Sequence, residues 1–85
     1  MRRYFFHVHN GTGFTQDPEG VELPSLEAAR EVALTGIRSI VGEEVESGLI
    51  DLQGRLNICD PAGSVLLSVP FSDAVALRVP DKEEE

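Results

Sequence analysis

The strongest pattern in this 85-residue chain is a single segment whose apolar residues recur with the period of an α-helix. Ser25 stands where an N-cap is favoured, and Glu27 follows in the first turn, where a negative charge stabilises the helix. Apolar and small side chains then form one broad stripe: Leu26, Ala29, Ala33, Leu34, Gly36, Ile37, Ile40 and Val41. The pattern predicts one helix over residues 26–41 that packs on a sheet.

We expect this helix to fray after Gly42, because the acidic residues Glu43, Glu44 and Glu46 oppose the negative end of the helix dipole. Gly48 is the last position at which it should stop. The small side chains within the stripe should let the helix approach the sheet closely, and for Gly36 such packing would compensate a cost of about 1 kcal/mol in helix propensity.

Two pairs of predicted strands flank the helix, and they are residues 2–9, 14–16, 55–59 and 64–69. Turn sequences separate the members of each pair, at Asn10–Gly13 and at Asp60–Gly63. Residues 21–23 are expected as an extended lead-in to the helix. The order ββαββ predicts an α+β fold: a four-stranded antiparallel sheet, in the spatial order 2-1-3-4, with the helix on one face. Residues 71–79 fit either a helical turn or a further short strand.

Alternation along the first strand predicts which side chains face the helix. Tyr4, Phe6 and Val8 share the helix side, and Phe5 lies on the other side. One helix shields only one face of such a sheet, so the reverse face should need a cover. Either the C-terminal segment with Val75, Leu77 and Val79 folds across it, or another molecule does. The candidate interaction face consists of Phe5, His7, His9, Cys59 and Leu66, and Phe14 is a further candidate by its position in the second strand.

Length and charge limit the classes of function. We expect one domain over residues 1–79 and an acidic, disordered tail over 80–85. The net charge is −8, with 7 Lys and Arg against 15 Asp and Glu, which argues against direct nucleic-acid binding. No apolar run is long enough for a membrane span, and the lone Cys59 forms no internal disulfide. These features are typical of a cytoplasmic protein.

Few residues have the pattern of a chemical site. His7, His9 and Cys59 are candidate ligands of zinc, but a fourth ligand is not evident, and the favoured interpretation is solvated or dimer-buried histidines and a small hydrophobic cysteine. Arg30 falls inside the helix stripe, so its guanidinium should form an ion pair with Asp17, Glu19, Glu22 or Asp73. No catalytic group or cofactor is predicted, and we expect no enzyme.

Four segments in this order resemble a family of short bacterial proteins of unknown function, of a type abundant in rhizobia: Arg3-Tyr4-Phe5-Phe6-His7-Val8, Gly20-Val21-Glu22-Leu23-Pro24, Leu26-Glu27-Ala28-Ala29-Arg30 and Val69-Pro70-Phe71-Ser72-Asp73-Ala74. The resemblance spans about residues 3–75 and implies a small cytosolic protein without an established activity. The order of strand, hairpin and Ala-rich helix is also similar to antitoxin domains of the HicB type, which add further strands that this chain lacks.

Three hypotheses of function follow. The first is a non-enzymatic protein-interaction module, most simply a homodimer, that uses the open sheet face or an edge strand. The second is an antitoxin-like regulator of a basic partner protein. The third is a metal-binding or small-molecule-binding domain.

Overall fold

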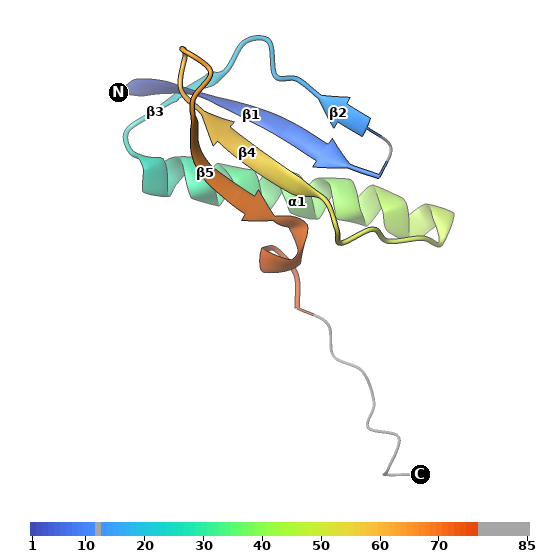
Figure 1. The fold of residues 1–85 in the computed structure, drawn as a ribbon. Helices are drawn as coiled ribbons and strands as arrows, with labels where there is room; N and C mark the ends of the chain where they lie inside the picture. Colours follow the sequence, from blue (N-terminus) through green and yellow to red (C-terminus); the bar gives the residue numbers. More distant parts are fainter. Residues whose placement is uncertain (12, 77–85) are drawn as a thin grey trace.

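The computed structural model describes residues 1–11 and 13–76, which form one antiparallel sheet with a single long helix on one side (Figure 1). The elements in chain order are β1 (Arg2–Asn10), β2 (Gly13–Thr15), β3 (Val21–Leu23), α1 (Leu26–Ser47), β4 (Arg55–Cys59), β5 (Val65–Pro70) and the short 3₁₀ helix η1 (Phe71–Asp73). The α+β class with one helix and an antiparallel sheet is confirmed. The expected tail over residues 80–85 lies outside the described part of the chain.

The sheet has five strands, so the expected count of four is wrong. The four expected segments lie in the order β2-β1-β4-β5, and β3 is an additional strand that pairs with β1. β2 and β3 share one edge of β1: β2 pairs with residues 8–10 and β3 with residues 2–4. The segment expected as a lead-in becomes a strand because the chain bends away from β1 after β2 and rejoins the same edge, in the same direction, at Gly20, which has a φ of 73°.

The helix does not fray after Gly42 as expected, and it ends at Gly48, the last stop that the sequence predicts. It runs to Ser47, and Gly48 terminates it with a φ of 88°, donating its N–H to the carbonyls of Glu44 and Val45. At the other end Ser25 is the N-cap, and its Oγ accepts the N–H of Ala28 at 3.1 Å. Gly42 and the three glutamates therefore do not stop the helix, whose left-handed glycine cap supplies the signal.

The core lies between α1 and the sheet face that carries Tyr4, as predicted. From α1 it contains Ala29, Ala33, Leu34, Ile37 and Val41, which meet Tyr4, Leu56, Ile58 and Val69 of the sheet. Phe6 and Val8 pack against the same cluster. Gly36 differs from expectation: a Cβ at this position would meet no other atom within 4 Å. Its lack of a side chain therefore does not serve close packing against the sheet.

The chain after β5 turns toward the helix side of the sheet. Phe71 and Ala74 are buried in the core, Val75 packs against it, and Arg38 of α1 donates from Nε to the Ala74 carbonyl at 2.7 Å. Of the two alternatives for residues 71–79, the structure shows a helical turn at Phe71–Asp73. The described part of the C-terminal segment thus covers the helix side. Leu77 and Val79 lie outside the described residues.

A carboxylate ties the far end of α1 to the tip of the β1–β2 hairpin. Asp51 donates its N–H to Glu44 Oε1 at 3.0 Å and accepts the N–H of Gly11 at Oδ2, at 3.1 Å. Its Oδ1 accepts the N–H of Gln53 at 2.9 Å. Asp51 therefore joins the helix layer to the sheet layer beyond the core. Among residues 1–11 and 13–76, no helix is long and apolar enough to cross a membrane.

Candidate interaction face

The sheet side opposite α1, here called the open face, carries an aromatic row made of Phe5, His7, His9 and Phe14. Alternation along β1 turns the first three away from the core, and the pairing of His9 with Phe14 adds the fourth ring from β2. Ring centroids lie 6.4 Å apart for Phe5 and His7, 5.8 Å for His7 and Phe14, and 4.5 Å for His9 and Phe14. The rings contact one another and stay half-buried, except for Phe14, which is 54% exposed.

Beside the aromatic row is a hollow of about 170 Å³ between the turn after β2 and the β4–β5 turn. Phe5 and His7 form its floor, and Asp17 and Asp60 contribute a carboxylate from each side, together with Gln16, Pro18, Pro61 and Gly63. A concave site with aromatic walls and two carboxylates has the chemistry that receives a cationic group.

Asp17 also fills the gap in strand pairing that β2 and β3 leave along this edge of β1. Residues 5–7 of β1 have no strand partner on this edge, and Asp17 Oδ2 accepts the N–H of Phe6 at 3.1 Å. Its Oδ1 accepts the N–H groups of Glu19 and Gly20, at 3.2 and 3.1 Å. Burial alone would raise the pKa of this carboxyl, but the three N–H donors and the nearby His7 together hold the pKa below its ordinary value.

The backbone of Asp17 fixes the orientation of His7. The N–H of Asp17 donates to His7 Nδ1 at 3.0 Å. Because an acceptor nitrogen carries no proton, the neutral ring has its hydrogen on Nε2. The imidazole is therefore held in one tautomer at the edge of the hollow.

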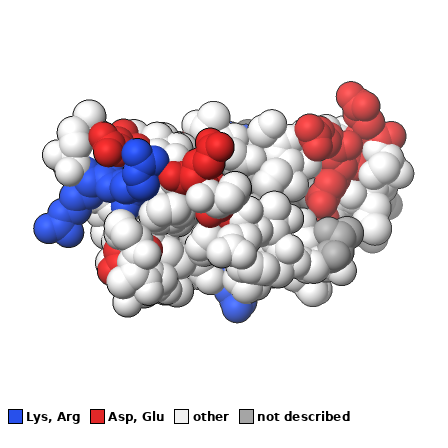
Figure 2. All heavy atoms as spheres, turned by 90° about the horizontal axis from the view of Figure 1, so that it is seen from above, with Lys and Arg blue, Asp and Glu red and all other residues white. Residues whose placement is uncertain are grey.

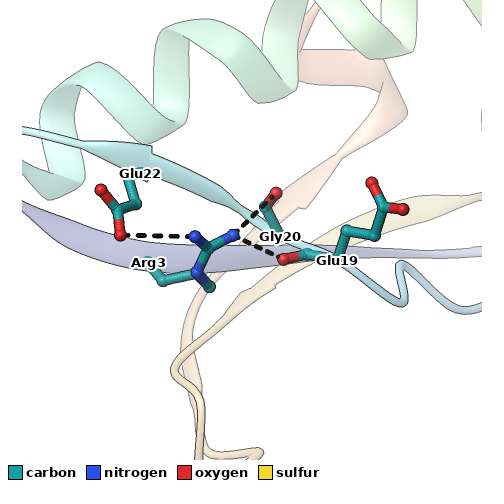
Figure 3. A network of polar contacts seen from close by, with 4 residues as sticks. All are labelled: Arg3, Glu19, Gly20 and Glu22. Atoms are coloured by element: carbon teal, nitrogen blue, oxygen red, sulfur yellow. Dashed lines mark hydrogen bonds and ion pairs between the residues drawn. The ribbon is translucent and has the colours of Figure 1, made fainter.

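Arg3 anchors the turn that carries Asp17 (Figure 3). Its Nη1 donates to the carbonyls of Glu19 and Gly20, at 2.8 and 3.5 Å, and its Nη2 pairs with Glu22 Oε2 at 3.3 Å. A Cβ at Gly20 would lie 2.9 Å from Arg3 Cγ and from the Tyr4 carbonyl oxygen. Only glycine therefore fits at position 20. Glu22 and the two carbonyls already compensate the positive charge of Arg3.

The structure brings Phe5, His7 and His9 together in one row, and the other two residues of the predicted face lie outside this row. Cys59 pairs with Phe5 in the register and is only 3% exposed, so it offers no surface to a partner. Burial, and then the charge of Asp60, raises the pKa of its thiol. Leu66 is the extra residue of a bulge between β4 and β5. It is 41% exposed and lines a separate hollow with Tyr4 and Arg2.

Arg30 is half-buried and forms no ion pair within residues 1–11 and 13–76. None of its four predicted partners lies within ion-pair distance, and Glu22 pairs with Arg3 instead. The β1–β3 pairing explains this difference, because it sets Glu22 directly opposite Arg3. Arg30 lines a shallow surface depression with Ser25 and Glu27.

Sequence reasoning missed Asp17, Asp60 and Arg55 as parts of this face. Asp17 and Asp60 each precede a proline in a turn, which predicts a turn but not a shared hollow. Arg55 pairs with His9 and therefore lies at the opposite end of the open face. It is exposed, and its side chain makes no hydrogen bond or ion pair with the described residues.

Charge is unevenly distributed over the surface. Figure 2 shows basic side chains gathered with acidic ones near the N-terminal end of the molecule, and a second acidic group at the end where α1 finishes. The surface between them in this view is mostly uncharged. Contacts with other molecules are least opposed by charge in such a neutral region.

The side chains that could ligate a metal do not converge in the described structure. Within residues 1–11 and 13–76, no group of three or more His, Cys, Asp or Glu side chains could hold a metal ion.

At the centre of the open face Asn57 pairs with His7, and its buried Oδ1 has no hydrogen-bond partner in the described part of the chain.

One family model matches the chain, over residues 3–72, and its description is "Domain of unknown function (DUF6894)". The match confirms the expectation of a short-protein family without an assigned activity. No curated protein and no solved structure matches the chain.

Proposed function

The chain belongs to the DUF6894 family of domains of unknown function, and from this premise we propose that it is a non-enzymatic protein-interaction module whose binding surface is the open face. The observation that carries the proposal is the aromatic row. It places four rings side by side on the sheet face that α1 leaves uncovered, and its outermost ring, Phe14, is 54% exposed.

Two features of the face support this function. Aromatic residues, and histidine with them, combine large contact area with few rotatable bonds, so little conformational entropy is lost on binding. The face is also prepared before binding, because Asp17 holds His7 and Phe6 in place and Arg3 holds the turn of Asp17. A preordered surface loses less free energy when a partner docks.

Site-specific photo-crosslinking tests this function. A benzophenone side chain at position 14 lies on the open face, and the same group at position 32 is the matched control, since Val32 is also exposed, at 40%, but on α1. In the cells that produce the protein, we expect an adduct of one defined mass from position 14 and none from position 32.

A second variant tests whether that adduct requires the aromatic row. Phe5→Asp introduces a charge into the row, so it should abolish the adduct from position 14 while the circular dichroism spectrum stays native. Adducts of equal yield from positions 14 and 32, or none from position 14, would contradict the proposal. The mass of the adduct distinguishes a second copy of the chain from a small basic protein, which the antitoxin-like hypothesis requires.

A further inference from the structure

Charged side chains lie at both ends of the open face. The hollow with Asp17 and Asp60 lies beside Phe5, and Arg55 lies at the other end, opposite His9. Arg55 and Cys59 are the first and last residues of β4, which corresponds to about 13 Å along the strand. His7 and Asn57 are paired midway between these ends.

The charged side chains at the two ends differ in the hydrogen bonds and ion pairs that they already form. Asp60 Oδ1 accepts the N–H of Ser64 at 2.8 Å, which holds this carboxylate in the β4–β5 turn. Arg3, the cation that anchors the turn of Asp17, is occupied by Glu22 and by two carbonyls. The Arg55 side chain lines a hollow with Asp51, whose carboxylate accepts the N–H groups of Gly11 and Gln53, and it forms no ion pair or hydrogen bond with the described residues. The face therefore has held carboxylates at one end and an unpaired guanidinium at the other.

We propose that a second copy of this chain covers the open face, related by a two-fold axis, so that Arg55 of each copy lies in the Asp17–Asp60 hollow of the other. This inference rests on the proposed function and names its partner.

The direction of the axis follows from the charges. An axis parallel to the sheet, perpendicular to the strands and near His7 and Asn57 exchanges the two ends of the face. Each Arg55 then meets two carboxylates, and the two symmetric contacts are equivalent. An axis along the strands would instead place Arg55 against Arg55 and Asp60 against Asp60, which like-charge repulsion disfavours.

The net charge of the chain makes this complementarity necessary. Two molecules of charge −8 repel each other, so a stable pair needs attraction at the contact itself. The proposed arrangement supplies two charge-assisted contacts around the aromatic row and encloses Phe14. A planar guanidinium also suits the hollow, because the rings of Phe5 and His7 form its floor.

Reversal of the two charges in separate variants tests the proposal. Sedimentation equilibrium at low ionic strength should give a dimer for the parent. Arg55→Glu and Asp60→Arg should each raise the dissociation constant at least about tenfold, since the first makes both contacts repulsive and the second sets a positive charge beside Asp17 in both.

An equimolar mixture of the two variants should associate again. The glutamate introduced in one variant then meets the arginine introduced in the other, while the native pair is retained in the second contact. Arg30→Glu is the control, since Arg30 lies on α1, on the other side of the sheet, and forms no ion pair with the described residues.

The outcomes separate this inference from the proposed function. A parent that stays monomeric at millimolar concentration, or a mixture that associates no better than either variant, overturns the two-fold pairing. A monomeric parent that crosslinks to a different protein from position 14 leaves the proposed function intact. If Asp60→Arg does not fold, Asp60→Asn keeps an acceptor for Ser64 and should still weaken the dimer; an unchanged dissociation constant then contradicts the pairing.

Discussion

The carboxylate of Asp17 accepts the backbone N–H of Phe6 at 3.1 Å, in the gap between two short strands that pair with the same edge of β1. The Asp17 side chain thus accepts an N–H group of β1 that a neighbouring strand would otherwise pair with. The same residue accepts two further N–H groups and orients His7 through its own backbone. Asp17 is therefore the residue on which the geometry of the open face most depends.

Asp17→Asn should lower the free energy of unfolding by about 1–3 kcal/mol at neutral pH, because an amide group would turn a donor toward one of the three N–H groups. Urea denaturation followed by circular dichroism measures this change. Asp73→Asn is the control, since Asp73 is exposed in η1 and accepts no side-chain hydrogen bond from the described residues. Equal stability of Asp17→Asn and the parent would contradict the role of Asp17.

The free energies of unfolding of the parent and of Asp17→Asn should depend on pH in different ways. Because the pKa of Asp17 is lower in the folded chain, its ionisation contributes stability that is fully present above the unfolded pKa of about 3.9. This contribution is lost as the pH falls through the folded pKa. The stability difference between the parent and Asp17→Asn should thus be constant near neutrality and shrink below about pH 4. A difference that grows in acid would show the opposite sign of the shift.

Gly36→Ala should stabilise the protein. The position lies inside α1, where alanine is favoured over glycine by about 1 kcal/mol, and a Cβ there meets nothing within 4 Å. Thermal unfolding should therefore shift to a higher midpoint. A lower midpoint would mean that Gly36 packs against something in solution, such as a partner on the outer side of the helix.

Gly54→Ala should destabilise the protein. A Cβ at this position would lie 2.8 Å from the His9 carbonyl oxygen and 2.9 Å from Phe71 Cε2, and Phe71 is fully buried. We expect a loss of about 1–3 kcal/mol from overpacking. Because Gly54 also accepts the N–H of Phe71, the shift should appear in amide exchange at Phe71 as well as in global stability.

The thiol of Cys59 should react slowly in the native protein. Burial and the neighbouring Asp60 raise its pKa, which reduces the fraction of reactive thiolate. The rate of reaction with an aromatic disulfide reagent should rise strongly in denaturant. In the native state Asp60→Asn should raise it modestly, whereas Asp73→Asn should leave it unchanged. A native rate equal to that of the unfolded chain would contradict the burial.

The layers of the fold could be predicted from the sequence because they follow from local periodicity. Alternation placed Tyr4 toward the helix and Phe5 away from it, and the stripe through Ala33 and Ile37 placed α1 on the sheet. These patterns depend on residues close together in the chain. The sequence alone was therefore enough to identify the open face.

What could not be predicted depends on pairs that are distant in sequence. β3 has only three residues. It becomes a strand because the chain rejoins the edge of β1 at Gly20, where Arg3 holds it. The bulge at Leu66, which breaks the alternation of β5, likewise depends on the pairing with β4.

The expected fraying of the helix after Gly42 was wrong for a different reason. The dipole effects of a few glutamates are worth only about 0.3–1 kcal/mol each. The left-handed cap at Gly48 and the contact of Glu44 with Asp51 favour continuation.

Asp51 gives the two layers of the molecule a mechanical connection outside the core. Its carboxylate holds Gly11, in the turn that leads to Phe14, while its own N–H is held by the last turns of α1. A displacement of the helix terminus is therefore transmitted to the hairpin tip, and with it to the most exposed ring of the row. In the interaction proposed for the open face, the helix layer on the far side would thus help to set the position of Phe14.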